Sequence, residues 1–178
     1  QVVGWCREIV GFPASAGGTL VSGGSMANLI GLAVARSVKA GIDVRELGVA
    51  AIPKPLRYYA SDQVHSCHRK AVEALGLGNR ALRRIPTDAA FKIDLGALRA
   101  AIAEDRASGF RPACVIGSAG TVNTGAVDDL DALATIAAEE DLWFHVDGCI
   151  GALVALAPGN AHVGAGIERA DSIALDPH

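Results

Sequence analysis

The sequence has few of the features that mark several large classes of protein. Its four cysteines are scattered and form no C-x-x-C pair, so neither a zinc ribbon nor a disulfide framework is indicated, and free thiols fit a reducing cytoplasm. Lys and Arg number 16 against 19 Asp and Glu, without a basic run, so nothing favours nucleic acid as a partner. No apolar run approaches the roughly 20 residues of a membrane span. We therefore expect a soluble, cytoplasmic protein that binds neither nucleic acid nor a membrane.

The chain has 178 residues, of which 51% are hydrophobic, enough to bury one continuous core. It begins with Gln1 rather than methionine, and it opens inside an apolar pattern. We therefore expect a single domain that is a segment of a longer protein.

Runs of strand length alternate with stretches of helical spacing along the chain. The six expected strands are residues 19–21, 57–60, 82–85, 113–116, 143–146 and 172–175. Helices are expected from about Ser25 to Lys39, from a cap at Asp94 to about residue 107, and from a cap at Asp128 to about residue 141, whereas residues 41–55 look irregular. This alternation predicts an α/β fold in which a mostly parallel sheet has helices on both faces.

Ser22-Gly23-Gly24-Ser25 is expected to join the first strand to the first helix. Backbone N–H groups and the helix dipole favour an anion at a helix start, glycine lets the backbone approach it, and the Ser25 hydroxyl adds a donor. The turn therefore fits a phosphate, although an ordinary turn with a serine cap is the alternative. Neither G-x-G-x-x-G nor G-x-x-x-x-G-K-[ST] occurs, which favours a small phosphorylated ligand over a dinucleotide or a nucleoside triphosphate.

Asp147 follows the fifth expected strand and precedes Gly148. A carboxylate at a strand end can keep a pyridine nitrogen protonated by favouring its positive charge, or it can simply cap the next turn. His145, Asp147 and Cys149 alternate, so a metal trio is a further alternative, although Gly148 should already turn the strand before Cys149.

Two histidines lie at the start of the helix after the second expected strand. An imidazole such as His65 in this position is, taken alone, more often a capping or surface residue. His68 carries no additional signal, and we expect it to face solvent.

Polar residues also follow the fourth and sixth expected strands. Gly120 and Thr121 follow the fourth, in a segment that can equally be an ordinary turn before a helix capped by Asp128. Asp176-Pro177-His178 follows the sixth, where proline fixes a bend that could aim His178 toward the strand ends. Because ligands collect at the carboxyl edge of a parallel sheet, we expect these residues to share one site.

Taken in order, these segments resemble those of the pyridoxal-phosphate-dependent (group II) amino acid decarboxylases, which include the aromatic amino acid and glutamate enzymes. The resemblance covers nearly the whole chain, from residues 22–28 through 59–66, 118–128 and 145–149 to the end. It implies that residues 1–178 are the central part of the large domain of a fold type I enzyme. It also implies pyridoxal 5′-phosphate as cofactor, α-decarboxylation of a small-molecule L-amino acid substrate, and a homodimer with active sites at the subunit interface.

The resemblance assigns roles to individual residues. It implies that His65 stacks on the pyridine ring and that Asp147 keeps the ring nitrogen protonated, so these two are the expected catalytic residues. The residues expected to bind the cofactor are Gly23, Gly24, Ser25, His65, Thr121, Asp147, Cys149 and His178. No metal is expected.

Two departures from the family pattern keep other functions open. In the resembling enzymes, the histidine that matches His178 is followed by the lysine that binds the cofactor aldehyde, whereas this sequence ends at His178. Val122 stands at a position where the family commonly has a hydroxyl. A catalytically degenerate scaffold or binding protein is therefore one alternative. Another fold type I reaction, such as aldehyde formation, carbon-carbon cleavage or transamination, is the other, because the segments that separate these reactions in the family are expected beyond His178. Lysine at position 179 would favour an enzyme.

Overall fold

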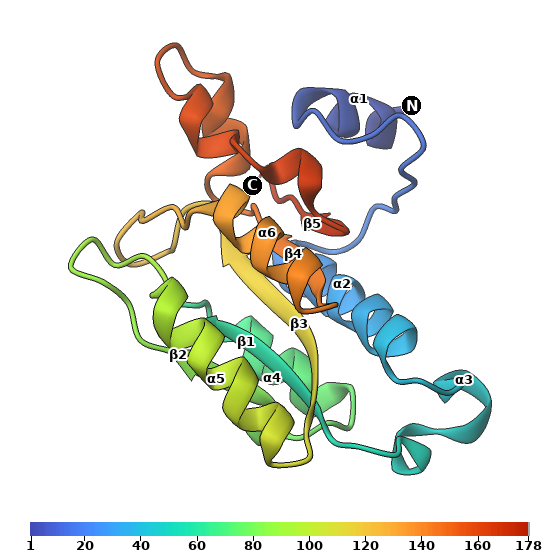
Figure 1. The fold of residues 1–178 in the computed structure, drawn as a ribbon. Helices are drawn as coiled ribbons and strands as arrows, with labels where there is room; N and C mark the ends of the chain where they lie inside the picture. The colour runs from blue at the N-terminus through green and yellow to red at the C-terminus, as the bar shows by residue number, and fades with distance from the viewer. Residues whose placement is uncertain (178) are drawn as a thin grey trace.

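A computed structural model describes residues 1–177 and shows a five-stranded parallel sheet between two layers of helices (Figure 1). The strands are β1 (Leu56–Ser61), β2 (Leu82–Ile85), β3 (Arg111–Ser118), β4 (Trp143–Asp147) and β5 (Ser172–Ala174). The helices are α1 (Val2–Ile9), α2 (Gly24–Lys39), α3 (Val44–Leu47), α4 (Cys67–Ala74), α5 (Leu95–Ala107) and α6 (Leu130–Glu139). The predicted α/β fold with a parallel sheet is confirmed.

The strands lie in the order β2-β1-β3-β4-β5, and each neighbouring pair is parallel. Helix α4 connects β1 to β2, α5 connects β2 to β3, and α6 connects β3 to β4. The register pairs Ser118 with Asp147 and Asp147 with Ala174, so β3, β4 and β5 end at one level. The segments that follow these strands therefore meet at one edge of the sheet.

Each face of the sheet has its own hydrophobic core. Tyr58 and Tyr59 are consecutive on β1 and fully buried, and they point to opposite faces as strand geometry requires. Tyr59 packs in the core beneath α5 and α6, which lie over the near face in Figure 1. Tyr58 packs in the core beneath α2 and α4, and its hydroxyl donates to the carbonyl oxygen of Leu32 on α2 (3.2 Å). This bond helps to fix α2, which begins at the candidate site.

Aspartates cap α5 and α6, but for α6 it is not the aspartate that was expected. Asp94 caps α5 as predicted, and its carboxylate accepts the N–H of Ala97 (2.9 Å). The cap of α6 is Asp129, which accepts the N–H of Ala132 (3.0 Å), so the prediction of Asp128 was wrong. The side chain of Asp128 is instead buried, where it accepts backbone N–H groups from two other segments.

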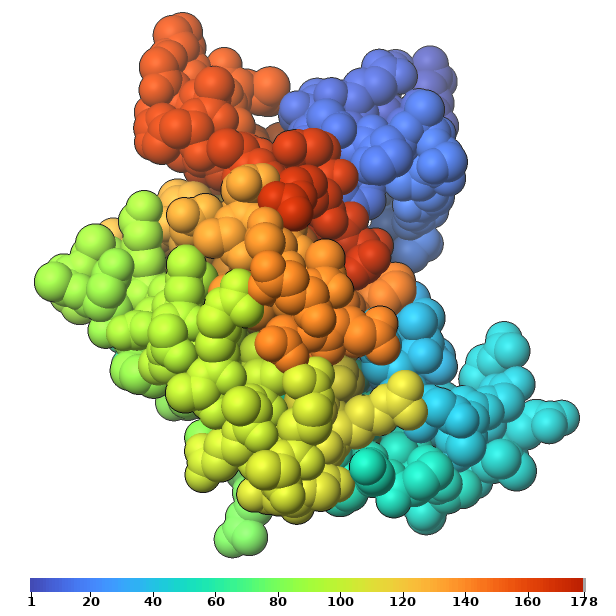
Figure 2. All heavy atoms as spheres, viewed as in Figure 1, coloured from blue at the N-terminus to red at the C-terminus, as the bar shows by residue number. Residues whose placement is uncertain are grey.

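Residues 19–21 are not a strand, so the first of the six predicted strands is wrong. Composition favours a strand there, but within the described chain the outer strands of the sheet are β2 and β5, and Leu20 is 68% exposed. Residues 41–55 are irregular as expected, apart from α3 and a short 3-10 turn. The start of the chain, residues 2–9, is helical, and Figure 2 shows this N-terminal part in blue as a projection from the main body. In residues 1–177, no helix is both long enough and apolar enough to span a bilayer.

Candidate active site

A cavity of about 350 Å³ lies at the carboxyl edge of the sheet. The start of α2 and the segments after β1, β3, β4 and β5 line it, which is where the sequence predicted a shared site. Its lining includes Gly23, Gly24, Ser25, His65, Thr121, Asp147 and Cys149. The structure thus brings together every predicted site residue except His178, which lies outside the described residues.

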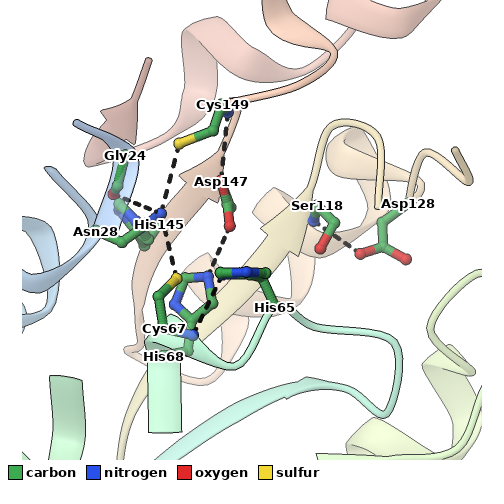
Figure 3. A network of polar contacts seen from close by, with 10 residues as sticks. All are labelled: Gly24, Asn28, His65, Cys67, His68, Ser118, Asp128, His145, Asp147 and Cys149. Atoms are coloured by element: carbon green, nitrogen blue, oxygen red, sulfur yellow. Dashed lines mark hydrogen bonds and ion pairs between the residues drawn. The ribbon is translucent and has the colours of Figure 1, made fainter. Parts of the chain in front are cut away.

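Asp147 ends β4 with its carboxylate held from two sides (Figure 3). Its Oδ2 lies 2.8 Å from Nε2 of His68, and its Oδ1 accepts the N–H of Cys149 at 3.3 Å. Burial by itself would raise the pKa of Asp147, but the hydrogen bond and the charge of His68 outweigh burial and hold the pKa well below its usual range. The carboxylate is therefore anionic at neutral pH.

His68 is completely buried, so the expectation that it faces solvent was wrong. Burial by itself would lower the pKa of His68. The hydrogen bond and charge of Asp147, together with those of Cys67, outweigh burial and raise the pKa to about 9. A signal for this burial was present in the sequence, because the buried stripe of α4 includes Cys67, His68, Ala71 and Val72. A helical repeat through the apolar members places His68 on the inner face.

His145 belongs to a second buried network rather than to the cavity wall. Its Nδ1 lies 2.8 Å from Oγ of Ser172 and its Nε2 lies 2.9 Å from Oδ1 of Asn28, so both ring nitrogens are engaged. Burial is the main cause that lowers the pKa of His145, to about 3, so the ring is neutral. The amide of Asn28 also donates toward Sγ of Cys149 (3.5 Å), and this links α2 to the turn after β4.

The alternating trio of His145, Asp147 and Cys149 therefore does not converge on one point. Ligand-type atoms of Cys67, His68 and Asp147 do lie within 4.8 Å of one another. His68 and Asp147 already hydrogen-bond each other directly, so we interpret this group as a hydrogen-bonded cluster.

His65 precedes α4 and lines the cavity with an exposed side chain. Its Nδ1 accepts the N–H of Cys67 (3.3 Å), which restrains the imidazole near Asp147 (Figure 3). The ring is thus placed where a flat ligand in the cavity could contact it.

The first turn of α2 forms another wall of the cavity. Gly23 has φ of +102°, a conformation that favours glycine, and a Cβ on Gly24 would lie 2.6 Å from Sγ of Cys149. The N–H of Gly24 donates to Oδ2 of Asp176 (2.7 Å), a contact that the sequence analysis missed because 152 residues separate the two. Ser25 also lines the cavity. A glycine pair therefore makes the close packing at this wall possible.

The segment after β3 closes the cavity with Thr121 and Val122. Thr121 is buried, and its hydroxyl hydrogen-bonds that of Thr124 (2.6 Å), whereas Val122 is 56% exposed and presents an apolar surface. Gly120, with φ of +96°, leaves room for the backbone of Gly151, which its Cβ would approach to 3.3 Å.

Comparison with known proteins identifies the family. The model of the pyridoxal-dependent decarboxylase conserved domain matches residues 1–178. The chain belongs to the pyridoxal-dependent decarboxylase family. It is 44% identical over 176 residues to an aromatic-L-amino-acid decarboxylase of Bacillus atrophaeus, which covers 99% of this chain and 35% of that protein.

Solved structures of similar proteins have the same fold. The apo crystal structure of mouse CSAD superposes with a TM-score of 0.94 at 34% identity, over 99% of this chain and 37% of that one. A 4-hydroxyphenylacetaldehyde synthase of Rhodiola rosea superposes with a TM-score of 0.85 at 32% identity, over 98% of this chain and 38% of that one. The chain thus spans about a third of the length of these relatives.

The residues of this decarboxylase-family chain fit pyridoxal phosphate. The cavity has an anionic carboxylate on one wall, a histidine ring beside it, and on another wall a helix start with glycine and a serine hydroxyl. The carboxylate can pair with a protonated pyridine nitrogen, and the helix start can bind a phosphate.

Proposed function

We propose that the full-length protein decarboxylates an L-amino acid with pyridoxal phosphate, and that residues 1–178 are the central part of its cofactor-binding domain. The observation that carries this proposal is the carboxylate of Asp147, kept anionic by His68, in the same cavity as the glycine-serine start of α2. Family membership supports the same reaction.

In this proposal the chain's own residues bind and orient the cofactor. Pyridoxal phosphate supplies an aldehyde that captures the substrate amine and a pyridine ring that takes up the electron pair left by carbon dioxide. Asp147 keeps the proton on the ring nitrogen, because an anion beside that nitrogen favours its charged form. His65 lies against the ring face and limits its tilt.

The phosphate is assigned to the start of α2, where Ser25 supplies a hydroxyl donor and Gly23 and Gly24 allow close approach. Thr121 and Cys149 line the remaining walls, and Val122 offers packing in place of the hydroxyl expected there. His178 stays a predicted phosphate contact.

The choice of substrate is proposed from the relatives. Similarity to an aromatic-L-amino-acid decarboxylase and to the cysteine sulfinic acid decarboxylase of Mus musculus supports testing aromatic and acidic amino acids. We also propose a cytoplasmic homodimer, supported by the scattered free cysteines and by the family resemblance. Light scattering of the full-length protein tests the dimer, and a monomeric mass would contradict it.

The central experiment measures carbon dioxide and amine released by the full-length protein, supplied with pyridoxal phosphate, from a panel of aromatic and acidic L-amino acids. We expect equal amounts of the two products from one class of substrate. Asp147→Asn should still bind the cofactor, because the phosphate wall is unchanged, but should lose roughly 10²–10³-fold in kcat, as when one preorganised electrostatic contact is removed. Full activity in this variant would contradict the role of Asp147.

Aldehyde formation is the second candidate, favoured by the similarity to the Rhodiola rosea 4-hydroxyphenylacetaldehyde synthase. Ammonia and aldehyde, measured in the same reactions, separate the two. Aldehyde in place of amine would replace decarboxylation to the amine as the assigned reaction, and no product from any substrate would favour a scaffold.

A further inference from the structure

The partner of the Asp147 carboxylate is a histidine on a different element, helix α4. His68 lies on the first turn of α4, 79 residues before Asp147, and its Nε2 is 2.8 Å from Oδ2. The imidazole is fully buried, and only 13% of the Asp147 side chain is exposed. Solvent therefore competes little for this hydrogen bond.

The two oxygens of Asp147 are held unequally. Oδ1 accepts a long backbone hydrogen bond, 3.3 Å from the nitrogen of Cys149, whereas the bond at Oδ2 is short. A charge-assisted bond to an imidazole is also the stronger type. His68 is therefore the main restraint on how the carboxylate is oriented at the cavity.

The other nitrogen of His68 makes no such bond within the described chain. Nδ1 is buried and has no hydrogen-bond partner among residues 1–177. His145, 6.3 Å away between ring centroids, is equally buried but has a partner on each nitrogen. An unsatisfied buried polar atom costs free energy, so its presence beside Asp147 calls for an explanation at the site.

We propose that His68 is a positioning residue that orients Asp147 and holds it as an anion toward the ring nitrogen of the bound cofactor. This inference rests on the proposed function. An apolar residue at position 68 would leave burial as the dominant influence on Asp147, and a neutral carboxylic acid would no longer favour a protonated ring nitrogen. His68 acts only through Asp147, since it does not line the cavity.

Other titratable groups lie near the pair and are kept constant in the test. They are His65 and Cys67 at the start of α4, His145 and Cys149 on and after β4, and Asp176 after β5. A chelator in all buffers keeps metal ions away from Cys67.

The experiment compares His68→Leu, which removes the donor, with His68→Gln, which keeps an amide donor without the charge. His162→Leu is the matched control, because His162 is an exposed histidine on the 3-10 helix Ala161–Gly164. The first readout is the titration of Asp147 in cofactor-free full-length protein labelled with carbon-13 at the aspartate carboxyls, assigned with Asp147→Asn. The second is the ultraviolet spectrum of bound deoxypyridoxine phosphate, which has no aldehyde and reports protonation of its ring nitrogen.

We expect the Asp147 titration in His68→Leu to rise by about 1–3 pH units, the effect of losing one close opposite charge. The analogue should lose its ring proton at lower pH than in the parent. His68→Gln should show a smaller shift in the same direction, and His162→Leu none. Circular dichroism checks folding, and if His68→Leu does not fold, His68→Gln decides alone.

Titration and spectrum unchanged from the parent, in a folded His68 variant, would overturn the proposal. Failure of the parent to bind the analogue would count against the proposed function instead. The carboxyl titration needs no cofactor, so it would still decide the role of His68.

Discussion

Gly31→Ala is expected to destabilise the protein by about 1–3 kcal/mol. Gly31 faces β4 from α2, and a Cβ there would lie 2.5 Å from Cε1 and 2.7 Å from Nδ1 of His145. That ring is fully buried and hydrogen-bonded at both nitrogens, so it cannot turn away without breaking a bond. Overpacking costs about 1–3 kcal/mol and a lost hydrogen bond about 0.5–1.5 kcal/mol, while replacing a helical glycine returns at most about 1 kcal/mol.

The matched control is Gly4→Ala on α1, where nothing lies within 4 Å of the added Cβ. There the helix-propensity term acts alone, so this variant should be as stable as the parent or more stable by up to about 1 kcal/mol. Urea unfolding of both variants gives the free energies, compared at unchanged m-value. If Gly31→Ala were as stable as Gly4→Ala, the tight contact between α2 and His145 would be refuted.

Two further predictions concern cofactor binding and pH. Ser25→Ala should raise the Kd for pyridoxal phosphate about 10- to 100-fold, since one hydrogen bond to a charged group is lost, with kcat at saturation nearly unchanged. Fluorescence titration checks this, and an unchanged Kd would count against the phosphate site. His68, with its pKa raised to about 9, stabilises fully below its ordinary value near 6.5 and less as pH rises through 9. His145, with its pKa lowered to about 3, stabilises the folded state fully above 6.5 and less as pH falls through 3. The free energy of unfolding, measured across pH, should therefore decline on both sides of 6.5. His68→Gln should remove the decline on the alkaline side.

The location of the site could be predicted from sequence because topology alone determines it. Parallel strands joined by helices place all carboxyl ends at one edge, so polar residues after successive strands must meet there. His65, Thr121 and Asp147 do so, although they are far apart in the chain. Residues 19–21 show the limit of composition, because a strand needs a neighbour and the described sheet does not extend to them.

The partners within the site could not be predicted in the same way. The contacts of Asp147 with His68 and of Gly24 with Asp176 depend on how far α4 and the end of the chain approach the cavity. Periodicity along α4 indicates which side of the helix is buried, but it does not indicate which residue of β4 that side meets. Side-chain pairs between distant segments therefore needed the three-dimensional structure.

Two aspartates near adjacent strand ends show how partners separate a structural carboxylate from a functional one. Asp128 is buried and accepts backbone N–H groups of Ile93 and Ser118, both at 2.8 Å, so each oxygen ties one segment to another. Burial raises the pKa of Asp128 despite these bonds, whereas the imidazole of His68 reverses the same influence at Asp147. A backbone amide can orient a carboxylate but carries no charge. A protonated histidine orients the carboxylate and also carries a positive charge. In the proposed function, the role of Asp147 in keeping a ligand nitrogen protonated therefore depends on the residue that α4 places beside it.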